Sequence, residues 1–377
     1  MTNIVISGYY GFANAGDEAM LAALLGSLED LIPGASITVI SGHPDMTREN
    51  HHVEAVHRLN FPGIARVICR ADLLISGGGS LLQDVTSARS LYYYLLIMRM
   101  ALFFHKPVML YAQGIGPIRR PKARKAVRNV LQRVTMIGVR DSESRMELQR
   151  LGVTVPPIHV TADAVLSMPP VDKKIGFYLL KKHGIEGVGT RIGIAIRNWQ
   201  HMTHYKEEIA KAADELVRTL GARIIFIPMQ YPADAEAASD VAALMKEPAT
   251  VLKESYNTVE FMALMGCMDV VIANRLHALI FASIMQVPVA AISYDPKIDG
   301  FISLIGETLC GTMETVTAKA LTEDVTAKLK AGGIQPEVRA RLNHLRRQSL
   351  RNAYLALRIL EGRKGVRKRL QQHRRSL

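Results

Sequence analysis

The stretch DVVIANRLHALIFASI, residues 269–284, joins two apolar runs through a short charged junction. The first run, DVVIA, is β-branched and predicts a buried strand, while the second, ALIFASI, predicts a buried helix. Arg275 and His277 stand at the junction between the two runs. An apolar strand followed directly by an apolar helix is typical of a parallel sheet that helices cover on both faces.

The same rhythm of strand, polar turn and helix recurs along the chain. The strand-like runs are NIVISG, ITVISG, DLLISGGG, PVMLYAQG, TMIGVRD and IHVTAD in the first half, and RIGIAIRN, RIIFIPM, TVLKE, DVVIANR and VAAISYD in the second. The rhythm breaks at residues 167–190, where Pro, Lys and Gly cluster. The sequence therefore predicts an α/β protein with two Rossmann-like domains, residues 1–170 and 171–335, and a basic C-terminal helix and tail, residues 336–377. Polar or Gly-rich clusters follow the strands of both halves, so we expect the two sheet edges to face one cleft. This is the layout of GT-B-like enzymes, and other two-domain α/β folds share it.

The composition indicates a folded, soluble, intracellular protein. Hydrophobic residues make up 49% of the chain and charged residues 21%. The three cysteines are far apart and show no CxxC spacing, which favours a reducing compartment and argues against a zinc site or a disulfide framework. The N-terminus lacks the pattern of a signal peptide, and the apolar stretch 91–104 is shorter than the roughly 20 residues that a membrane span needs. We expect a cytoplasmic protein, at most peripheral to a membrane.

The net charge of +13 is concentrated at the C-terminus. Residues 338–377 contain thirteen Lys or Arg and one acid, Glu361, so almost the whole excess lies there. A basic segment of this kind attracts the phosphates of nucleic acid or of anionic lipid headgroups. The alternative is a solvated helix with a frayed end.

Basic side chains follow three strands of the second half. Arg197 follows IGIAI, Arg275 and His277 follow DVVIA, and Lys297 follows VAAIS. A guanidinium presents a planar fork to a carboxylate or phosphate, and the first turn of a helix adds backbone N–H groups. The set therefore suits a small, highly anionic ligand.

Each of these residues also has a structural explanation. An Arg after a strand is commonly a surface ion pair, and Lys297 has Asp295 and Asp299 beside it. Arg275 and His277 lie between apolar runs that predict burial, and charged groups are seldom buried without a partner. For that pair we favour a ligand site over a structural ion pair.

The first half offers glycines where the second offers cations. GYYGFANAGDEA (8–19) leads from the first strand into a helix, with Asn14 and Asp17 as a cap or as ligands of a hydroxyl group. SGGGSLLQD (76–84), which contains Gly78, Gly79 and Ser80, predicts a Gly-rich turn at a helix N-terminus, and AQGIGP (112–117) predicts another turn. None has the spacing of a dinucleotide or Walker A loop. Taken singly, each is better explained as a tight turn alone. Three on one sheet edge favour a backbone that makes room for a bulky acceptor.

Seven motifs, taken in their order along the chain, resemble those of the polysaccharide pyruvyl transferase family, most closely of its CsaB-type members. The motifs are GYYGFANAGDEA, SGGGSLLQD, AQGIGP, VRD, TAD, ANRLHALIFA and SYDPK. The resemblance covers about residues 3–305. It implies a GT-B-like fold and transfer of an enolpyruvyl-derived group from phosphoenolpyruvate to a sugar as a ketal. For CsaB-type members the resemblance implies that the sugar is N-acetylmannosamine of a secondary cell-wall polymer. S-layer homology domains then recognise the ketal pyruvate on that polymer.

The resemblance also implies roles for the residues. The motif of Arg275, Leu276 and His277 would hold phosphoenolpyruvate, and Arg197 and Lys297 resemble the family's further basic residues. We expect Arg275 and Arg197 to clamp the two anionic groups, Lys297 to neutralise the leaving phosphate, and His277 to act as general acid.

The acceptor is expected on the first domain. Asn14, Asp17, Gly78, Gly79 and Ser80 are its predicted residues, with Asp17 as the base. No metal and no cofactor are expected, because the cations already neutralise the donor's charge. If the acceptor is carried on a lipid diphosphate, the basic tail would hold the enzyme at an anionic membrane surface on the cytoplasmic side, and nucleic acid is an unlikely partner.

Two other functions compete with this interpretation. A nucleotide-sugar glycosyltransferase of the same fold would use the cations to bind a diphosphate, and fold alone does not separate the two chemistries. A non-enzymatic polyanion-binding protein would act through the tail, with an affinity that falls steeply with salt, but it leaves the internal cations without a role.

Overall fold

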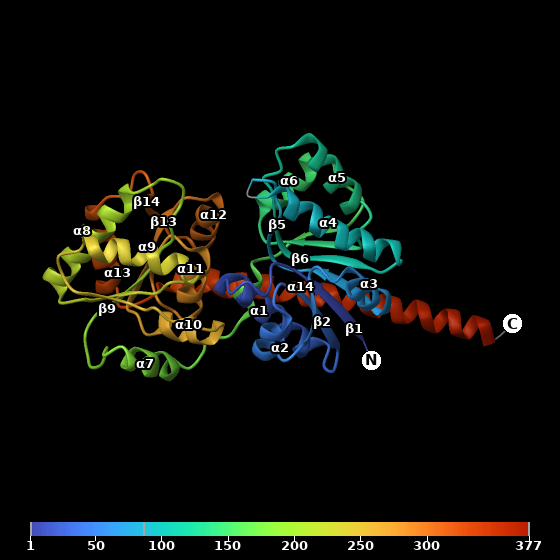
Figure 1. The fold of residues 1–377 in the computed structure, drawn as a ribbon, viewed down its shortest axis with the longest axis horizontal. Helices are drawn as coiled ribbons and strands as arrows, with labels where there is room; N and C mark the ends of the chain where they lie inside the picture. The colour runs from blue at the N-terminus through green and yellow to red at the C-terminus, as the bar shows by residue number, and fades with distance from the viewer. Residues whose placement is uncertain (1, 86, 376–377) are drawn as a thin grey trace. The chain divides into compact units, whose positions relative to one another are not determined.

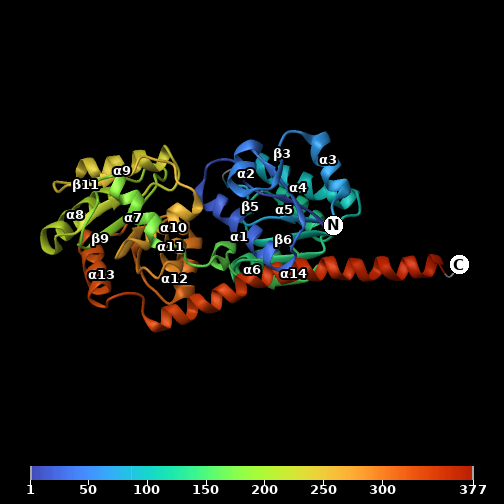
Figure 2. The same ribbon diagram turned by 90° about the horizontal axis from the view of Figure 1, so that it is seen from below.

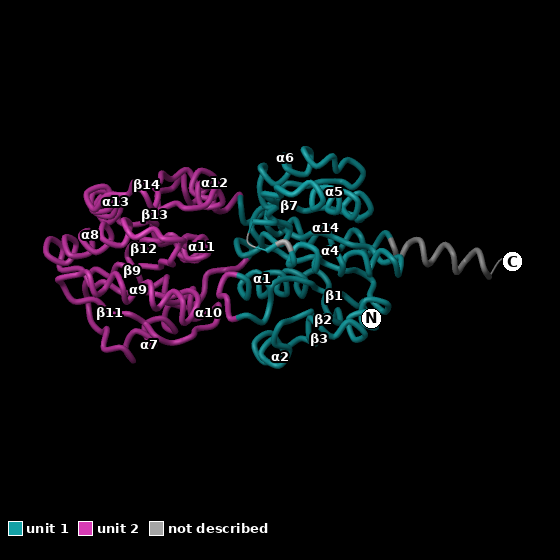
Figure 3. Tube along the Cα trace, turned by 45° about the horizontal axis from the view of Figure 1, so that its top comes forward, with its two compact units in different colours: residues 1–12, 17–167, 345–377 teal, residues 13–16, 168–344 magenta. Residues whose placement is uncertain are grey.

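The structure is a computed structural model that describes residues 2–85 and 87–375; the side chains of Ala88 and of residues 363–375 are outside the described set. Figure 1 labels its helices and strands, and Figure 2 shows them from below. The chain forms two compact units, coloured in Figure 3. The first comprises Met1–Phe12, Asp17–Ser167 and Leu345–Leu377, and the second comprises Ala13–Gly16 and Met168–His344.

The first unit is built on one parallel sheet. Within the described residues it has eight strands, in the order β3-β2-β1-β4-β6-β7-β8, with β5 paired to β6. Their bounds are β1 (Asn3–Ser7), β2 (Ser36–Ser41), β3 (Glu54–His57), β4 (Leu73–Ser76), β5 (Gly79–Leu82), β6 (Val108–Ile115), β7 (Met136–Val139) and β8 (Ile158–Val160). All residues of β4 and β6 are buried, as the near-continuous apolar runs predict for the centre of a parallel sheet.

Helices cover this sheet and supply its core. They are α1 (Ala15–Leu31), α2 (Pro44–His51), α3 (Phe61–Arg70), α4 (Ala88–Phe103), α5 (Pro121–Leu131) and α6 (Ser142–Arg150), followed by the 3₁₀ turn η1 (Ala164–Ser167). Polar side chains start several of them: Asn60 accepts from Gly63 N–H and Asp141 accepts from Ser144 N–H. Such caps satisfy backbone donors that have no partner inside the helix. Apolar side chains of α3, α4 and α5 pack with those of β4, β6 and β7 in one core.

The second unit repeats the plan with a smaller sheet. Its described strands are all parallel, in the order β11-β10-β9-β12-β13-β14. Their bounds are β9 (Arg191–Ala195), β10 (Arg223–Phe226), β11 (Ala249–Val251), β12 (Val270–Ala273), β13 (Val289–Ser293) and β14 (Leu309–Thr312). The helices are α7 (Lys173–Lys182), α8 (His204–Leu220), α9 (Ala233–Leu244), α10 (Thr258–Gly266), α11 (Leu276–Ile284), α12 (Pro296–Ile305) and α13 (Ala318–Lys330). The α/β class with two Rossmann-like parallel sheets is thus confirmed.

The C-terminal helix α14 (Pro336–Arg375) joins both units. It begins in the second unit, and from Leu345 it belongs to the first, where Figure 2 shows it running along β6. Asn352 is fully buried; its Oδ1 accepts from Ala112 N–H at 3.2 Å, and its Nδ2 donates to Thr161 Oγ1 at 2.9 Å. The sequence predicted a separate basic segment, residues 336–377, whereas the structure makes residues 345–360 part of the first unit's packing.

The basic tail is described only in part. Six of its cations have described side chains: Arg339, Arg341, Arg346, Arg347, Arg351 and Arg358. The other seven, from Arg363 to Arg375, lie outside the described side chains. In the described part of the chain, no helix is both long enough and apolar enough to cross a membrane.

Three strands were missed, and two predicted turns are mostly strand. The missed strands are β3, β5 and β14. Residues 79–82 form β5 and not a turn at a helix N-terminus, since the next helix begins only at Ala88. Pairing with β6 holds this short segment extended, and such a long-range partner is invisible in local composition. AQGIGP is also mostly strand, because β6 continues to Ile115.

Candidate functional site

Three neighbouring strands deliver the predicted cations to one edge of the second sheet. β9, β12 and β13 are adjacent, and the last residues of β9 and β12, Ala195 and Ala273, pair with each other. Arg197 and Arg275 each lie two residues beyond these ends, and Lys297 lies just beyond β13 in the first turn of α12. The carboxyl edge of a parallel sheet is where ligands of open α/β folds bind.

Arg275 is buried and forms an ion pair with Asp234. Its Nε donates to Asp234 Oδ2 at 2.8 Å and its Nη2 bonds to Oδ1 of the same carboxylate, while Nη2 also donates to Gln230 Oε1 at 3.3 Å. The two side chains are 11% and 2% exposed. The structural ion pair that the sequence analysis ranked second for Arg275 is therefore present. It fixes one edge of the guanidinium fork against the first turn of α9.

Arg197 is held by aromatic rings and by a buried amide. Its Cζ lies 5.3 Å from the Trp199 ring centroid and 5.8 Å from that of Tyr294, and its Nη1 donates to Tyr294 Oη at 3.4 Å. Its backbone N–H donates to Oδ1 of Asn274, which is fully buried, at 2.9 Å. No carboxylate bonds to this guanidinium among the described residues. Arg197 thus presents its charge at the edge, beside the neighbouring rings of Trp199 and Tyr294.

Asn274 is a site residue that the sequence analysis missed. Its N–H donates to Ala195 O at 3.2 Å and its side chain bonds to the backbone of Arg197, so it ties the end of β12 to the end of β9. A polar residue immediately after a strand of apolar residues was the available signal.

Lys297 forms an ion pair with Asp295, one of the two acids that the sequence offered as its partner. Its Nζ lies 3.1 Å from Asp295 Oδ2, while its backbone N–H donates to Asp295 Oδ1 as part of the cap of α12. Both side chains are about one-third exposed, at 31% and 29%. Such a pair is weak and opens readily for a stronger anion.

His277 lies in the first turn of α11, beside Leu276, which is buried. Its ring packs on the backbone of Gly16, because a Cβ added at Gly16 would fall 2.1 Å from His277 Nδ1. Residues 13–16 belong to the second unit, and Ala15 N–H donates to Met229 O at 3.3 Å. Asn14 accepts from Gly16 N–H at 3.1 Å and so shapes the start of α1, as its predicted capping role requires.

In the first unit, the predicted glycines make room for other side chains. A Cβ on Gly79, whose φ is +92°, would lie 3.2 Å from Met20 Cε and 3.6 Å from Asp17 Oδ1. A Cβ on Gly78 would lie 3.0 Å from Met20 Sδ. The structure therefore brings Asp17, Gly78 and Gly79 together at the start of β5. The space that these glycines leave is filled by α1, and binding of an acceptor there stays a prediction.

Arg140 is a second residue that the sequence analysis missed, although VRD and TAD supported the resemblance. Its side chain is 9% exposed; Nη2 donates to Ser80 Oγ at 3.1 Å and Nη1 lies 3.6 Å from Asp163 Oδ2. A Cβ on Gly114 would fall 2.8 Å from Nη2, so that glycine makes room for the guanidinium. Motifs far apart in sequence thus meet around one buried charge at the carboxyl edge of the first sheet.

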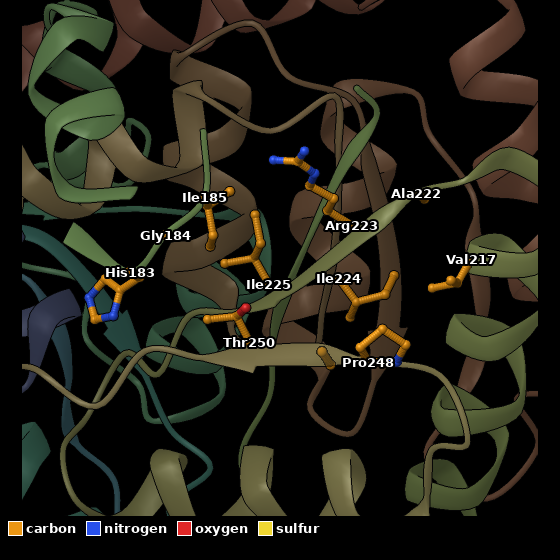
Figure 4. Close-up of a pocket in the computed structure, with 11 residues that line it drawn as sticks. His183, Gly184, Ile185, Val217, Ala222, Arg223, Ile224, Ile225, Pro248 and Thr250 are labelled. Carbon is orange, nitrogen blue, oxygen red and sulfur yellow. The ribbon is translucent and has the colours of Figure 1, made fainter. Parts of the chain in front are cut away.

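A pocket of about 270 Å³ lies elsewhere in the second unit. Figure 4 shows its lining, which includes His183, Arg223 and Thr250. β10 begins at Arg223 and β11 at Ala249, so the pocket is at the amino ends of the strands, opposite the edge that carries the predicted cations. Among the described residues, no group of three or more His, Cys, Asp or Glu side chains is arranged to hold a metal ion.

The family model for polysaccharide pyruvyl transferases matches residues 14–296. The chain belongs to the polysaccharide pyruvyl transferase family. The matched range includes Asn14 and Arg275–His277 and ends one residue before Lys297. Membership of this family indicates a transferase enzyme.

Other similarities are more distant. The amylovoran biosynthesis protein AmsJ of Erwinia amylovora is 22% identical over 251 residues, which is 62% of this chain and 60% of that protein. UDP-GlcNAc 2-epimerase from Methanocaldococcus jannaschii is similar in structure, with a TM-score of 0.66, 11% identity and coverage of 92% of this chain and 98% of that one. Anabaena Alr3699/HepE in complex with UDP-glucose has a TM-score of 0.61, 12% identity and coverage of 97% and 100%. At these identities the likeness shows the GT-B-like fold alone.

Proposed function

We propose that the protein transfers a pyruvyl group from phosphoenolpyruvate to a sugar as a ketal, with release of phosphate. The observation that carries the proposal is the edge formed by β9, β12 and β13, where Arg197, Arg275 and Lys297 follow neighbouring strands and His277 lies in the first turn of a buried helix. Phosphoenolpyruvate carries a carboxylate and a phosphate on a three-carbon skeleton, so it matches a compact set of cations.

The ion pair of Arg275 refines its role. Asp234 occupies Nε and Nη2, so Nη1 is the group that we assign to the donor. Arg197, which the rings of Trp199 and Tyr294 hold in place, binds the second anionic group. Lys297 leaves Asp295 to neutralise the departing phosphate.

The reaction moves two protons in net terms, both from acceptor hydroxyls: one ends on C3 and one on the departing phosphate. His277 acts as general acid and protonates C3, which makes C2 electrophilic. One sugar hydroxyl attacks C2, the C2–O bond to phosphate breaks, and a second hydroxyl attacks C2 to close the six-membered ketal. One hydroxyl proton replaces, on His277, the proton delivered to C3, and the other leaves with the phosphate.

Asp17 is the base assigned to the acceptor, and the acceptor-binding residues are Asn14, Gly78, Gly79 and Ser80. The reaction needs no metal or cofactor, since the basic side chains stabilise its charges.

We further propose that the acceptor is N-acetylmannosamine in a lipid-linked precursor of a secondary cell-wall polymer, as in CsaB-type members, and that the product anchors S-layer proteins. The basic C-terminal segment would then hold a cytoplasmic enzyme at the inner, anionic face of the membrane, by attraction that salt weakens. Nucleic acid is not a partner in this scheme.

Isothermal titration with phosphoenolpyruvate, UDP and CMP tests the donor. We expect the wild type to bind phosphoenolpyruvate and Arg197→Met to lose at least tenfold in affinity. Arg223→Met is the matched control, because Arg223 lies at the opposite edge of the same sheet. Arg197 is preferred to Arg275 as the first target, since replacing Arg275 leaves the Asp234 carboxylate buried without its partner.

Binding of a nucleotide in place of phosphoenolpyruvate would establish the rival function, a nucleotide-sugar glycosyltransferase. The similarity of fold to proteins solved with UDP or UDP-glucose is the observation that favours this rival. It would overturn the roles given to His277 and Lys297.

A further inference from the structure

Aromatic rings and one guanidinium form a cluster at the carboxyl edge of the first sheet. Tyr9 and Phe12 follow β1, Arg58 directly follows β3, and Tyr93 comes from α4. The rings of Tyr9 and Phe12 stack with centroids 4.2 Å apart and planes 11° apart. Arg58 Cζ lies 5.3 Å from the Phe12 centroid and 5.1 Å from the Tyr93 centroid. We call these four residues the Tyr9–Arg58 cluster.

Within the described part of the chain, no carboxylate pairs with the charge of Arg58. Among the described residues its guanidinium makes no hydrogen bond or ion pair, and its Nε is buried without an acceptor. At the sheet edges, Arg275 and Arg140 each lie against carboxylates, whereas Arg197, like Arg58, has no carboxylate bonded to it among the described residues. A cation that is withdrawn from water without a carboxylate is arranged to receive an anion from outside the chain.

The cluster is also fixed in place before any ligand arrives. Tyr93 Oη donates to the carbonyl oxygen of Arg58 at 3.0 Å, and Arg58 N–H donates to Ser41 O at 2.8 Å. A Cβ on Gly42 would lie 2.6 Å from Phe12 Cζ, so the backbone supports that ring closely. Rigid groups lose little entropy on binding, which favours a recognition role.

We propose that the Tyr9–Arg58 cluster is a subsite for a sugar phosphate, with the sugar along the exposed parts of the Tyr9 and Phe12 rings and the phosphate on Arg58. Tyr9 is 37% exposed and Phe12 is partly exposed, so they offer aromatic surface that suits the C–H groups of a sugar. A guanidinium fork matches phosphate, and because Tyr9 and Arg58 both contact Phe12, the cluster matches a phosphate that is joined to a sugar. This inference rests on the proposed function, because it gives the phosphorylated part of the glycan acceptor a place on the same sheet edge as Asp17 and Gly79.

Isothermal titration with N-acetylglucosamine 1-phosphate, N-acetylglucosamine and inorganic phosphate tests the subsite on the full chain. We expect the sugar phosphate to bind more tightly than either part alone, and Arg58→Met to weaken it at least tenfold. Tyr9→Leu is expected to weaken the sugar phosphate and to leave inorganic phosphate unchanged. Arg66→Met, an exposed site on the neighbouring α3, is the matched charge control and is expected to bind as the wild type does.

Wild-type affinity in Arg58→Met, or an equal loss in Arg66→Met, overturns the subsite. Circular dichroism confirms that each variant is folded. If Arg58→Met is not, Arg58→Lys carries the test: it keeps the charge but loses the fork, so most of the affinity should be lost, and full affinity overturns the proposal. Phosphoenolpyruvate in the same titration separates the two proposals. If the wild type binds phosphoenolpyruvate but no sugar phosphate, the subsite alone is contradicted. If it binds the sugar phosphate but not phosphoenolpyruvate, the proposed donor is contradicted.

Discussion

Arg275 and Asp234 form a two-point ion pair in the second unit, with Nε donating to Oδ2 at 2.8 Å and a second bond from Nη2 to Oδ1. The carboxylate lies in the first turn of α9 and the guanidinium at the start of α11, so the pair links the loops that follow β10 and β12. Asp234 also accepts from Met229 N–H at 3.2 Å, which orients the carboxylate. The cation proposed to bind the donor therefore has a built-in counter-charge that sets its direction.

Asp234→Ala is expected to destabilise the protein by about 3–5 kcal/mol, because it leaves a buried guanidinium without its partner. Chemical denaturation measures the free energy of unfolding. Asp234→Leu combined with Arg275→Met removes both charges and should restore most of the loss. If the double variant is as unstable as the single one, the ion pair is not the cause.

Gly16→Ala is expected to reduce transfer activity at least tenfold and to leave the fold intact. The added Cβ would meet the ring of His277 at 2.1 Å, and the ring must move. Gly26→Ala in the same helix is the control: nothing lies within 4 Å of its Cβ, so it should retain activity and gain about 0.5–1 kcal/mol of stability. Full activity in Gly16→Ala would show that the ring position is not critical.

His277→Ala is expected to abolish turnover with little change in phosphoenolpyruvate affinity, because the imidazole delivers a proton and the neighbouring cations hold the charge. Phosphate release measures turnover, and titration measures affinity. His201→Ala, at an exposed position, is the control. A variant that keeps most of its turnover would remove His277 from the catalytic role.

Asn352→Leu is expected to cost about 1–3 kcal/mol, because Ala112 N–H is left buried without its acceptor. Thermal and denaturant unfolding measure the loss. Tyr354→Ala on the same helix, at a side chain 54% exposed, should change stability far less. Equal losses in the two variants would mean that α14 contributes through helix propensity and not through this buried amide.

Asp84 is expected to contribute stability that acid removes. Burial raises the pKa of its carboxyl group, but the N–H groups of Arg119 and Arg120, each donating at 2.8 Å, outweigh burial and lower the pKa. A depressed pKa gives stability above the pKa of the unfolded chain, and this stability is lost as the pH falls through the ordinary carboxyl range near about 4.

Asp84→Asn should therefore show a shallower loss of stability between about pH 5 and pH 3 than the wild type does. The free energy of unfolding at several pH values measures the slope. Asp30→Asn, at an exposed position, should keep the wild-type slope. A wild-type slope in Asp84→Asn would mean that the loop after Pro117 does not depend on this carboxylate.

The sequence by itself determined the fold class and where the chemistry-bearing residues stand on the elements. Burial of a strand on both faces demands a continuous apolar run, and that demand is local, so DVVIA and PVMLYAQG were recognisable as central strands. The placement of Arg275 and His277 between a strand and a helix was equally local. Asn14 as the residue that shapes the start of α1 followed from the same kind of short-range rule.

Only the tertiary structure decided the partners of these residues. Asp234 lies 41 positions from Arg275, and Asn352 lies 240 positions from Ala112. Hydrogen bonds and ion pairs act over a few ångströms in space, whatever the separation along the chain, so no local pattern encodes which partner will be met. The same reason hid β5, which pairing with β6 holds extended, and the meeting of Arg140 with Ser80 and Asp163. It also hid the surroundings of Arg58, which show no carboxylate partner among the residues that the structure describes.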